Sequence, residues 1–268
     1  MKIAISPMAV SDYLTRPTDL TYKNDVHTML YRIKQLGYEG IEGGTMAGYT
    51  NEEYKALLDE IGLQAVTVGS PGPGLFPISE IDSVIEECKV LGAKNVMVGC
   101  MHPLVLGNPT ELKKFIADLN RAGELLMQEG IHLSYHNHAV DFSKVNGKRI
   151  LDQIVEGTDE RYVFFEPDTH WIQAGGGHVI SWLKKLRGRM YMVHFKDYAI
   201  DPYSDHSFLE CTHKLFAEVG EGNLNWPGII AECKAQNLEW CAVEQDKVQR
   251  PGYEACKISI DNLRKFGV

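Results

Sequence analysis

The chain has 268 residues and a formal net charge of −9, and 44% of its residues are hydrophobic while 24% are charged. This composition is ordinary for a globular protein and excludes the disordered classes of protein. The acidic balance also argues against a nucleic-acid-binding protein, because such a protein normally presents a basic surface to phosphates.

The first half of the chain alternates short apolar runs with stretches of helical periodicity. A strand at residues 2–6 precedes a helix at residues 25–37, where Gly37 is placed to end the helix. The unit then recurs, with Asn51 as the expected cap of the second helix and a turn-rich loop at residues 71–74. The later strands are expected at residues 40–43, 63–69 and 93–100, and the later helices at residues 51–62, 78–91 and 110–129.

The second half of the chain continues the same alternation. Strands are expected at residues 131–138, 162–168, 190–196 and 239–244, and helices at residues 149–155, 180–186, 226–236 and 253–266. Eight strands that alternate with helices predict parallel pairing and a closed (β/α)₈ TIM barrel. An open doubly wound sheet is disfavoured, because residues 7–10 lack the glycine-rich fingerprint that follows the first strand of a dinucleotide-binding fold. We therefore expect no nicotinamide cofactor.

No linker divides the chain, so we expect a single TIM-barrel domain over residues 1–268. Residues 1–7 are too short an apolar run for a signal peptide, and no later segment reaches the length of a membrane span. These features predict a cytoplasmic protein. The cysteines lack C-x-x-C spacing, and we expect reduced structural thiols at Cys88, Cys100, Cys211, Cys233, Cys241 and Cys256.

Polar residues stand at the expected carboxyl ends of the strands, where a TIM barrel carries its catalytic groups. His136 and His138 should project from the same face at the end of the fifth strand. The full set is Glu42, His102, His136, His138, Glu166, Asp168, His194, Lys196 and Glu244. Carboxylates and imidazoles without cysteine suit a borderline divalent ion such as Mn²⁺, Zn²⁺, Co²⁺ or Fe²⁺. The sequence therefore predicts a metal site whose ion is not fixed.

Several short runs occur in one order along the chain. They are YHNH at residues 135–138, DF at 141–142, EPDTHW at 166–171, AGG at 174–176, HFKD at 194–197, VGEG at 219–222, WP at 226–227 and VEQD at 243–246. The ordered set resembles the sugar phosphate isomerase/epimerase family of xylose-isomerase-like TIM barrels, which also includes inosose dehydratases. The resemblance covers nearly the whole chain.

This resemblance implies one divalent metal, most often Mn²⁺, with Co²⁺, Zn²⁺, Fe²⁺ and Mg²⁺ left open. Matched residue by residue, Asp168, His194 and Glu244 would be ligands. The fourth ligand would be His136, where many family members have a glutamate. That departure removes one negative charge and one candidate acid or base. Inosose dehydratases have a histidine-rich run at this place.

Ordinary structural roles compete with the metal reading for several of these residues. Asp168 is suited to cap a helix or turn, and His194 in an apolar strand is suited to be a hydrogen-bonded core residue. Trp171 is as well suited to pack on the barrel rim as to stack on a sugar ring. Lys196 is suited to form a structural salt bridge. Glu244 favours the metal reading, because an unpaired carboxylate at a buried strand end is costly.

The chemistry implied by such a site is proton removal beside a carbonyl group, through a metal-stabilised enediolate. Glu244 is the expected proton-transfer group, and His138 or His136 is suited to act as an acid. Epimerisation, aldose–ketose isomerisation and elimination share that intermediate. We expect an isomerase or epimerase, with a dehydratase or lyase as the close alternative and a non-catalytic sugar-binding barrel as the third. A related class of endonucleases would need a three-metal cluster and a DNA-binding face that the sequence does not indicate.

The expected partner is a sugar or polyol of about monosaccharide size, with neither nucleic acid nor membrane as a partner. The sequence leaves open which sugar it is and whether the sugar is phosphorylated. It also leaves open the oligomeric state of the protein, which includes a homo-oligomer. The residues expected to contact it are Glu42, His102, His138, Trp171, Lys196 and Arg250.

Overall fold

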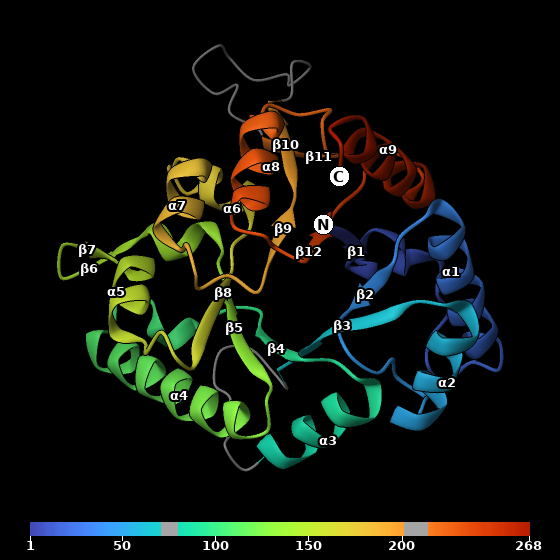
Figure 1. The fold of residues 1–268 in the computed structure, drawn as a ribbon, viewed down its shortest axis with the longest axis horizontal. Helices are drawn as coiled ribbons and strands as arrows, with labels where there is room; N and C mark the ends of the chain where they lie inside the picture. Colours follow the sequence, from blue (N-terminus) through green and yellow to red (C-terminus); the bar gives the residue numbers. More distant parts are fainter. Residues whose placement is uncertain (71–79, 201–213) are drawn as a thin grey trace.

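The computed structural model describes residues 1–70, 80–200 and 214–268, and within them eight parallel strands form one sheet. Their order in the sheet is β8 (Val163–Glu166), β5 (His132–His136), β4 (Asn95–Val98), β3 (Gln64–Gly69), β2 (Gly40–Glu42), β1 (Lys2–Ile5), β12 (Trp240–Val243) and β9 (Met192–Phe195). The two end strands meet through backbone bridges that pair Phe165 with Met190 and Asp168 with His194. The sheet therefore closes into a barrel, which confirms the predicted fold (Figure 1).

Helices surround the barrel on its outside (Figure 1). They are α1 (Tyr22–Leu36), α2 (Asn51–Ile61), α3 (Ile81–Leu91), α4 (Pro109–Gln128), α5 (Ile150–Gly157), α6 (Thr169–Ala174), α7 (Val179–Lys185), α8 (Trp226–Ala235) and α9 (Gly252–Lys265). Helix α6, which directly follows β8, has no counterpart in the sequence prediction. The cap of α2 is Thr50 rather than Asn51: Thr50 Oγ1 accepts from the backbone N–H of Glu53, and the Glu53 carboxylate accepts in return from the Thr50 N–H.

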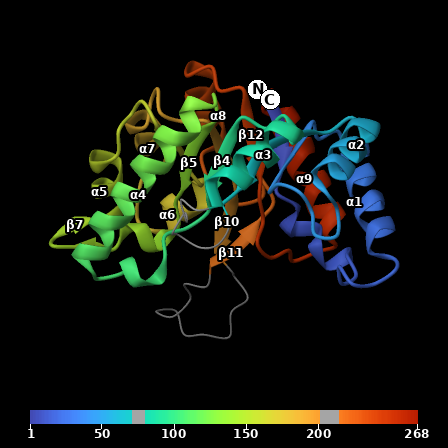
Figure 2. The same cartoon turned by 90° about the horizontal axis from the view of Figure 1, so that it is seen from below.

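Smaller elements decorate the ends of the barrel. They are η1 (Pro7–Tyr13), η3 (Pro103–Val105), η4 (Ala139–Phe142), the hairpin of β6 (Lys144–Val145) and β7 (Lys148–Arg149), and the hairpin of β10 (Asp197–Ile200) and β11 (Lys214–Ala217). The β10–β11 hairpin and the chain termini lie at opposite ends of the barrel (Figure 2). The predicted loop at residues 71–74, the start of the predicted helix at 78–91 and Cys211 lie outside the described residues.

The barrel interior is built in layers from alternate residues of the strands, as expected from the period of two. An apolar layer contains Ala4, Val66, Met192, Trp240 and Ala242. Further along the same strands, towards their carboxyl ends, the inward residues are polar and charged although they are buried. The outward faces of the strands pack against the helices in a single large apolar cluster. The polar end of the interior is therefore the place to look for function.

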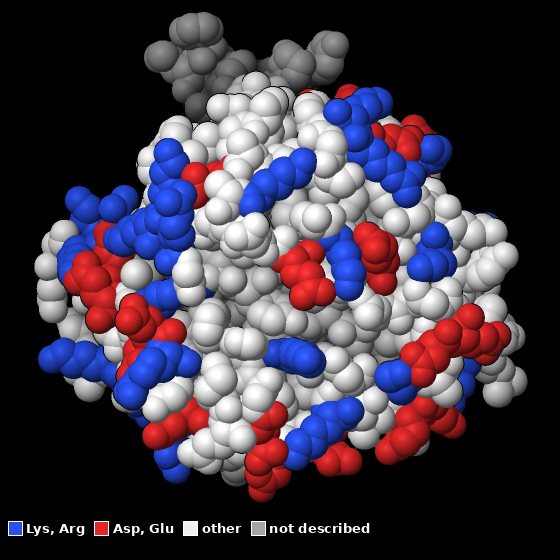
Figure 3. Space-filling model, in the orientation of Figure 1, with Lys and Arg blue, Asp and Glu red and all other residues white. Residues whose placement is uncertain are grey.

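No helix in the described ranges is long and apolar enough to cross a bilayer. The face shown in Figure 3 carries lysine and arginine interspersed with aspartate and glutamate, rather than one continuous basic area. The cysteines among the described residues are free thiols, and all but Cys100 are buried.

Asp197 explains why several of the short sequence runs occur together. Its carboxylate accepts from the backbone N–H groups of Gly220, Gly222 and Leu224 at 3.0, 3.1 and 3.3 Å, and from the indole N–H of Trp226 at 2.5 Å. Charge-assisted hydrogen bonds of this kind are about twice as strong as neutral ones. One buried carboxylate thus fixes the chain between the β10–β11 hairpin and α8, and these runs have a structural role.

Gly222→Ala is expected to lower the free energy of unfolding by about 1–3 kcal/mol, because overpacking a tight site costs about that much. A Cβ at this position would overlap Asp197 Oδ1 and the backbone oxygen of Tyr198. The measurement is denaturant unfolding followed by circular dichroism. The matched control is Gly99→Ala, where the nearest atom to the new Cβ would be Met97 Cε at 3.8 Å, so stability should change little. Equal stability of the two variants would contradict the role given to Asp197.

Candidate metal centre

Four side chains with metal-binding atoms converge at the carboxyl end of the barrel. His136 ends β5, Asp168 lies two residues beyond β8, His194 lies in β9, and Glu244 directly follows β12. One ligand atom from each of the four lies within 4.8 Å of the others. These four strands are neighbours around the closed barrel, and all four side chains are buried. The structure thus brings together the ligand set that the sequence predicts.

Two of these side chains carry a buried polar atom that has no hydrogen-bond partner among the described residues. These atoms are His136 Nδ1 and Asp168 Oδ2. Asp168 Oδ1 accepts from the backbone N–H of Trp171 at 2.7 Å and so caps α6. The capping role and the ligand role are therefore compatible, because each uses a different oxygen. Buried polar atoms in native proteins nearly always have a partner, so these unpaired atoms fit a bound ion.

The local charge balance also fits a bound dication. Lys196 Nζ lies 3.0 Å from Glu244 Oε2, 2.6 Å from Asp246 Oδ2 and 3.6 Å from Asp168 Oδ2. With His194 neutral, as a metal ligand must be, three ionised carboxylates and one ammonium leave a formal charge of −2, which a dication would cancel. An uncompensated buried charge costs several kcal/mol, so the residues present suit a divalent metal ion better than an empty site.

The two histidines differ in protonation. Burial lowers the pKa of His136 well below its ordinary value, and the charge of His194 lowers it further, so a neutral lone pair is available. Burial alone would also lower the pKa of His194, but the carboxylates of Glu42, Glu244 and Glu166 outweigh burial and hold that pKa well above its ordinary value. A metal that binds to His194 must therefore displace a proton, so metal affinity should rise with pH.

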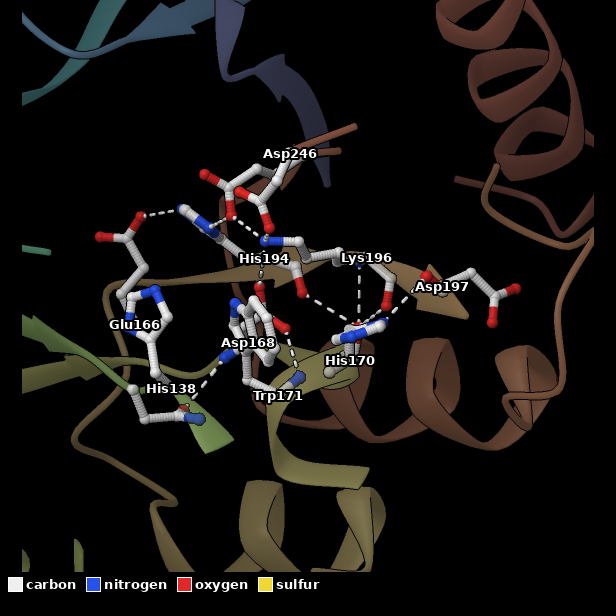
Figure 4. Close-up of polar contacts among 12 residues, drawn as sticks. His138, Glu166, Asp168, His170, Trp171, His194, Lys196, Asp197 and Asp246 are labelled. Carbon is white, nitrogen blue, oxygen red and sulfur yellow. Dashed lines mark hydrogen bonds and ion pairs between the residues drawn. The ribbon is translucent and has the colours of Figure 1, made fainter. Parts of the chain in front are cut away.

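A second group of side chains adjoins the four ligands. The ring centroid of His138 lies 4.9 Å from that of His136 and 5.4 Å from that of Trp171, and Lys196 Nζ lies 4.9 Å from the Trp171 ring. Figure 4 shows His138, Trp171 and Lys196 around Asp168 and His194. His138 Nδ1 and Trp171 Nε1 are buried atoms without a hydrogen-bond partner in the part of the chain that the structure describes. These atoms are available to hydrogen-bond a polar ligand beside the metal set. His138 itself lies two residues beyond the end of β5, whereas the sequence predicts it within the strand.

Three other residues that the sequence predicts as substrate contacts have protein partners in the structure. Glu42 is 4% exposed, and its Oε1 lies 3.1 Å from His194 Nε2, on the ring nitrogen opposite the one that faces Glu244. His102 caps η3 by accepting from the Leu104 N–H. The half-exposed side chain of Arg250 pairs with the buried carboxylate of Glu218 at 3.3 Å.

Two residues near the site were missed by sequence reasoning. Asp246 holds Lys196, and the alternation from Glu244 could have placed it inside the barrel. Phe216 comes from β11, and its ring centroid lies 5.7 Å from that of Trp171 and 5.3 Å from Lys196 Nζ. No local signal in the sequence indicates Phe216, because the hairpin brings it to the site.

Comparison with known proteins places this geometry in context. The model of a family described as "Xylose isomerase-like TIM barrel" matches residues 30–266. An inosose dehydratase from Mesomycoplasma hyopneumoniae (strain 7448) is 27% identical over 261 residues, which cover 87% of this chain and 85% of that protein.

Solved structures show the same fold. A sugar phosphate isomerase/epimerase from Parabacteroides distasonis ATCC 8503 has a TM-score of 0.75 at 20% identity, covering 98% of this chain and 93% of that one. A structure of IOLI protein with a bound zinc atom has a TM-score of 0.71 at 16% identity, covering 99% and 98%.

Proposed function

Because the chain belongs to the xylose isomerase-like TIM barrel family, we propose that it is an enzyme that uses one divalent metal ion to remove a proton beside the carbonyl of a keto-sugar or keto-inositol. The observation that carries the proposal is the convergence of His136, Asp168, His194 and Glu244, with unpaired buried atoms on two of them. Two imidazoles and two carboxylates suit Mn²⁺, which is our first choice, as well as Zn²⁺, Co²⁺ and Fe²⁺. When bound, such an ion supplies Lewis acidity to the charge that develops on the carbonyl oxygen.

Two side chains are in the right form to accept the substrate proton. Burial raises the pKa of Glu244, but the positive charges of His194 and Lys196 outweigh burial and hold that pKa well below its ordinary value. Burial and the charge of Lys196 lower the pKa of His138, so its ring is neutral near pH 7. We assign proton removal to Glu244. A proton held by Glu244 or His138 is then available to a departing hydroxyl or alkoxyl group.

Among the reactions that begin with this step, we place elimination first. Epimerisation needs proton-transfer groups on two opposite faces of the substrate. The resemblance implies a glutamate for one of them, but His136 stands at that position, neutral because of its lowered pKa. The inosose dehydratase relative, matched over most of both chains, supports the same order. The likeness to a sugar phosphate isomerase/epimerase supports isomerisation or epimerisation as the second candidate.

The substrate is proposed to lie against His138, Trp171 and Lys196. An indole ring offers a flat apolar surface for the carbon face of a sugar ring and a donor at its edge. The Trp171 Nε1 and His138 Nδ1 atoms supply unpaired hydrogen-bonding groups on this side of the four ligands. This placement supports a polyol as the ligand.

Incubation with Mn²⁺ in deuterated water, followed by proton NMR, tests the function. A panel of keto-sugars and keto-inositols should contain a compound that loses its α-proton signal and gives an unsaturated or dehydrated product. An intact stereoisomer with deuterium at the inverted carbon would reverse the order of the two candidates. Binding without any exchange across the panel would contradict an enzyme and indicate a sugar-binding barrel.

A further inference from the structure

His194 presents its two ring nitrogens to two different sets of carboxylates. Nδ1 lies 3.0 Å from Glu244 Oε2, on the side of the four ligands. Nε2 lies 2.6 Å from Glu166 Oε1 and 3.1 Å from Glu42 Oε1, on the other side. The ring therefore connects the candidate metal centre with a deeper part of the barrel interior.

Glu166 is held in place by a buried polar layer. Its Oε2 accepts from Ser134 Oγ at 3.0 Å and from Asn95 Nδ2 at 3.4 Å, and Asn95 Nδ2 lies 3.2 Å from Thr67 Oγ1. These side chains come from β3, β4, β5 and β8. All four residues are fully buried.

A polar layer inside a barrel lowers the stability of the fold. Its presence therefore points to a role other than stability. The corresponding interior layers of TIM barrels are dominated by branched apolar residues. A buried hydroxyl or amide lowers stability when it is imperfectly paired, and a buried carboxylate lowers it more. The layer around Glu166 delivers one oxygen to His194 Nε2 at 2.6 Å, within the range of a strong charge-assisted hydrogen bond.

We propose that Glu166 is a positioning residue that accepts the Nε2–H of His194 and so presents the Nδ1 lone pair to the metal. Thr67, Asn95 and Ser134 hold Glu166 in the orientation that this requires. A histidine ligand that donates its second N–H to a carboxylate is fixed both in tautomer and in ring orientation. The inference rests on the proposed function, because it needs a metal at the four ligands.

Glu42, Glu166 and His194 also bring ligand atoms within 4.8 Å of one another, but we assign no second metal ion to them. The distance of 2.6 Å between His194 Nε2 and Glu166 Oε1 is that of a hydrogen bond, and it leaves no room for an ion between the two atoms. Glu42, at 3.1 Å, is the weaker partner of the same N–H.

The first test needs no substitution. Long-range ¹H–¹⁵N correlation of the imidazoles in the zinc-loaded wild-type protein should show His194 protonated at Nε2 and free of a proton at Nδ1. The reverse tautomer would overturn the inference while leaving metal binding intact. A protein that binds no metal would overturn the proposed function as well. Two equivalents of metal per chain would point to an ion at Glu42 and Glu166 and would also overturn the inference.

The second test uses calorimetric titration of apo protein with Mn²⁺ and with Zn²⁺. Glu166→Leu should weaken affinity about 10- to 100-fold, the usual effect of removing the partner of a histidine ligand. Glu166→Gln retains an acceptor oxygen and should lose less, and its fold can be checked separately. The matched control is Glu232→Gln, which alters a buried glutamate of α8 that pairs with Arg187. Wild-type affinity in both Glu166 variants would contradict the proposal.

Discussion

Asp168→Asn and His194→Ala are each expected to lower metal affinity by more than about 100-fold. Loss of a group that merely orients a ligand costs 10- to 100-fold, so loss of a ligand itself must cost more. Asn is as good a helix cap as Asp, so Asp168→Asn should keep the bond to the Trp171 N–H and the start of α6 while it removes the charge. Elemental analysis of protein purified without chelator, with calorimetric titration of the apo form, measures the effect.

The matched control for the aspartate variant is Asp261→Asn. Asp261 lies on α9 and forms a surface ion pair with Lys257, so its loss should leave metal affinity unchanged. One equivalent of metal in wild type and control, with little or none in Asp168→Asn and His194→Ala, is the expected pattern. Wild-type metal content in both ligand variants would show that the ion binds elsewhere.

Glu244→Gln is expected to slow exchange of the substrate α-proton by about 10²- to 10⁴-fold, the usual contribution of a positioned base. The amide keeps an oxygen towards the other three ligands but cannot accept a proton. The measurement is the rate of deuterium incorporation under saturating Mn²⁺, with the metal content determined in the same samples. Saturating metal separates loss of the base from loss of the ligand.

Asp246→Asn is the informative comparison, because Asp246 forms an ion pair with Lys196 as Glu244 does but is not one of the four proposed ligands. If Glu244 is the base, exchange should fall much less in Asp246→Asn than in Glu244→Gln. If exchange falls more in Asp246→Asn than in Glu244→Gln, Asp246 is the base. Exchange at the wild-type rate in Glu244→Gln would exclude Glu244 as the base.

The sequence predicts the fold well because the period-two and helical patterns are strong in every unit of the barrel. It also predicts a polar cluster, because the carboxyl ends of parallel barrel strands meet at one end, and the family resemblance selects the four converging side chains from that cluster. Element boundaries are less accurate, as Thr50 in place of Asn51 and the end of β5 at His136 show.

The depth of a side chain within the barrel is harder to predict. The predicted strand at residues 162–168 puts Glu166 and Asp168 on the same side, but two residues along a strand correspond to about 6.6 Å. Alternation alone therefore places both inside, without showing that Asp168 joins the ligands while Glu166 contacts the opposite nitrogen of His194. Phe216 has no signal at all, since only the tertiary fold brings its hairpin to Trp171.

The double use of Asp168 has a consequence for ligand binding. One oxygen caps the helix that carries Trp171, while the other is free for the ion. We therefore expect an ion that shifts the Asp168 carboxylate to shift the first turn of α6 as well. A sugar that binds to the indole should shift the carboxylate in return. As a result, we expect occupancy of the two proposed sites to be thermodynamically coupled. By reciprocity, whatever factor the ion applies to sugar affinity, the sugar must apply to ion affinity.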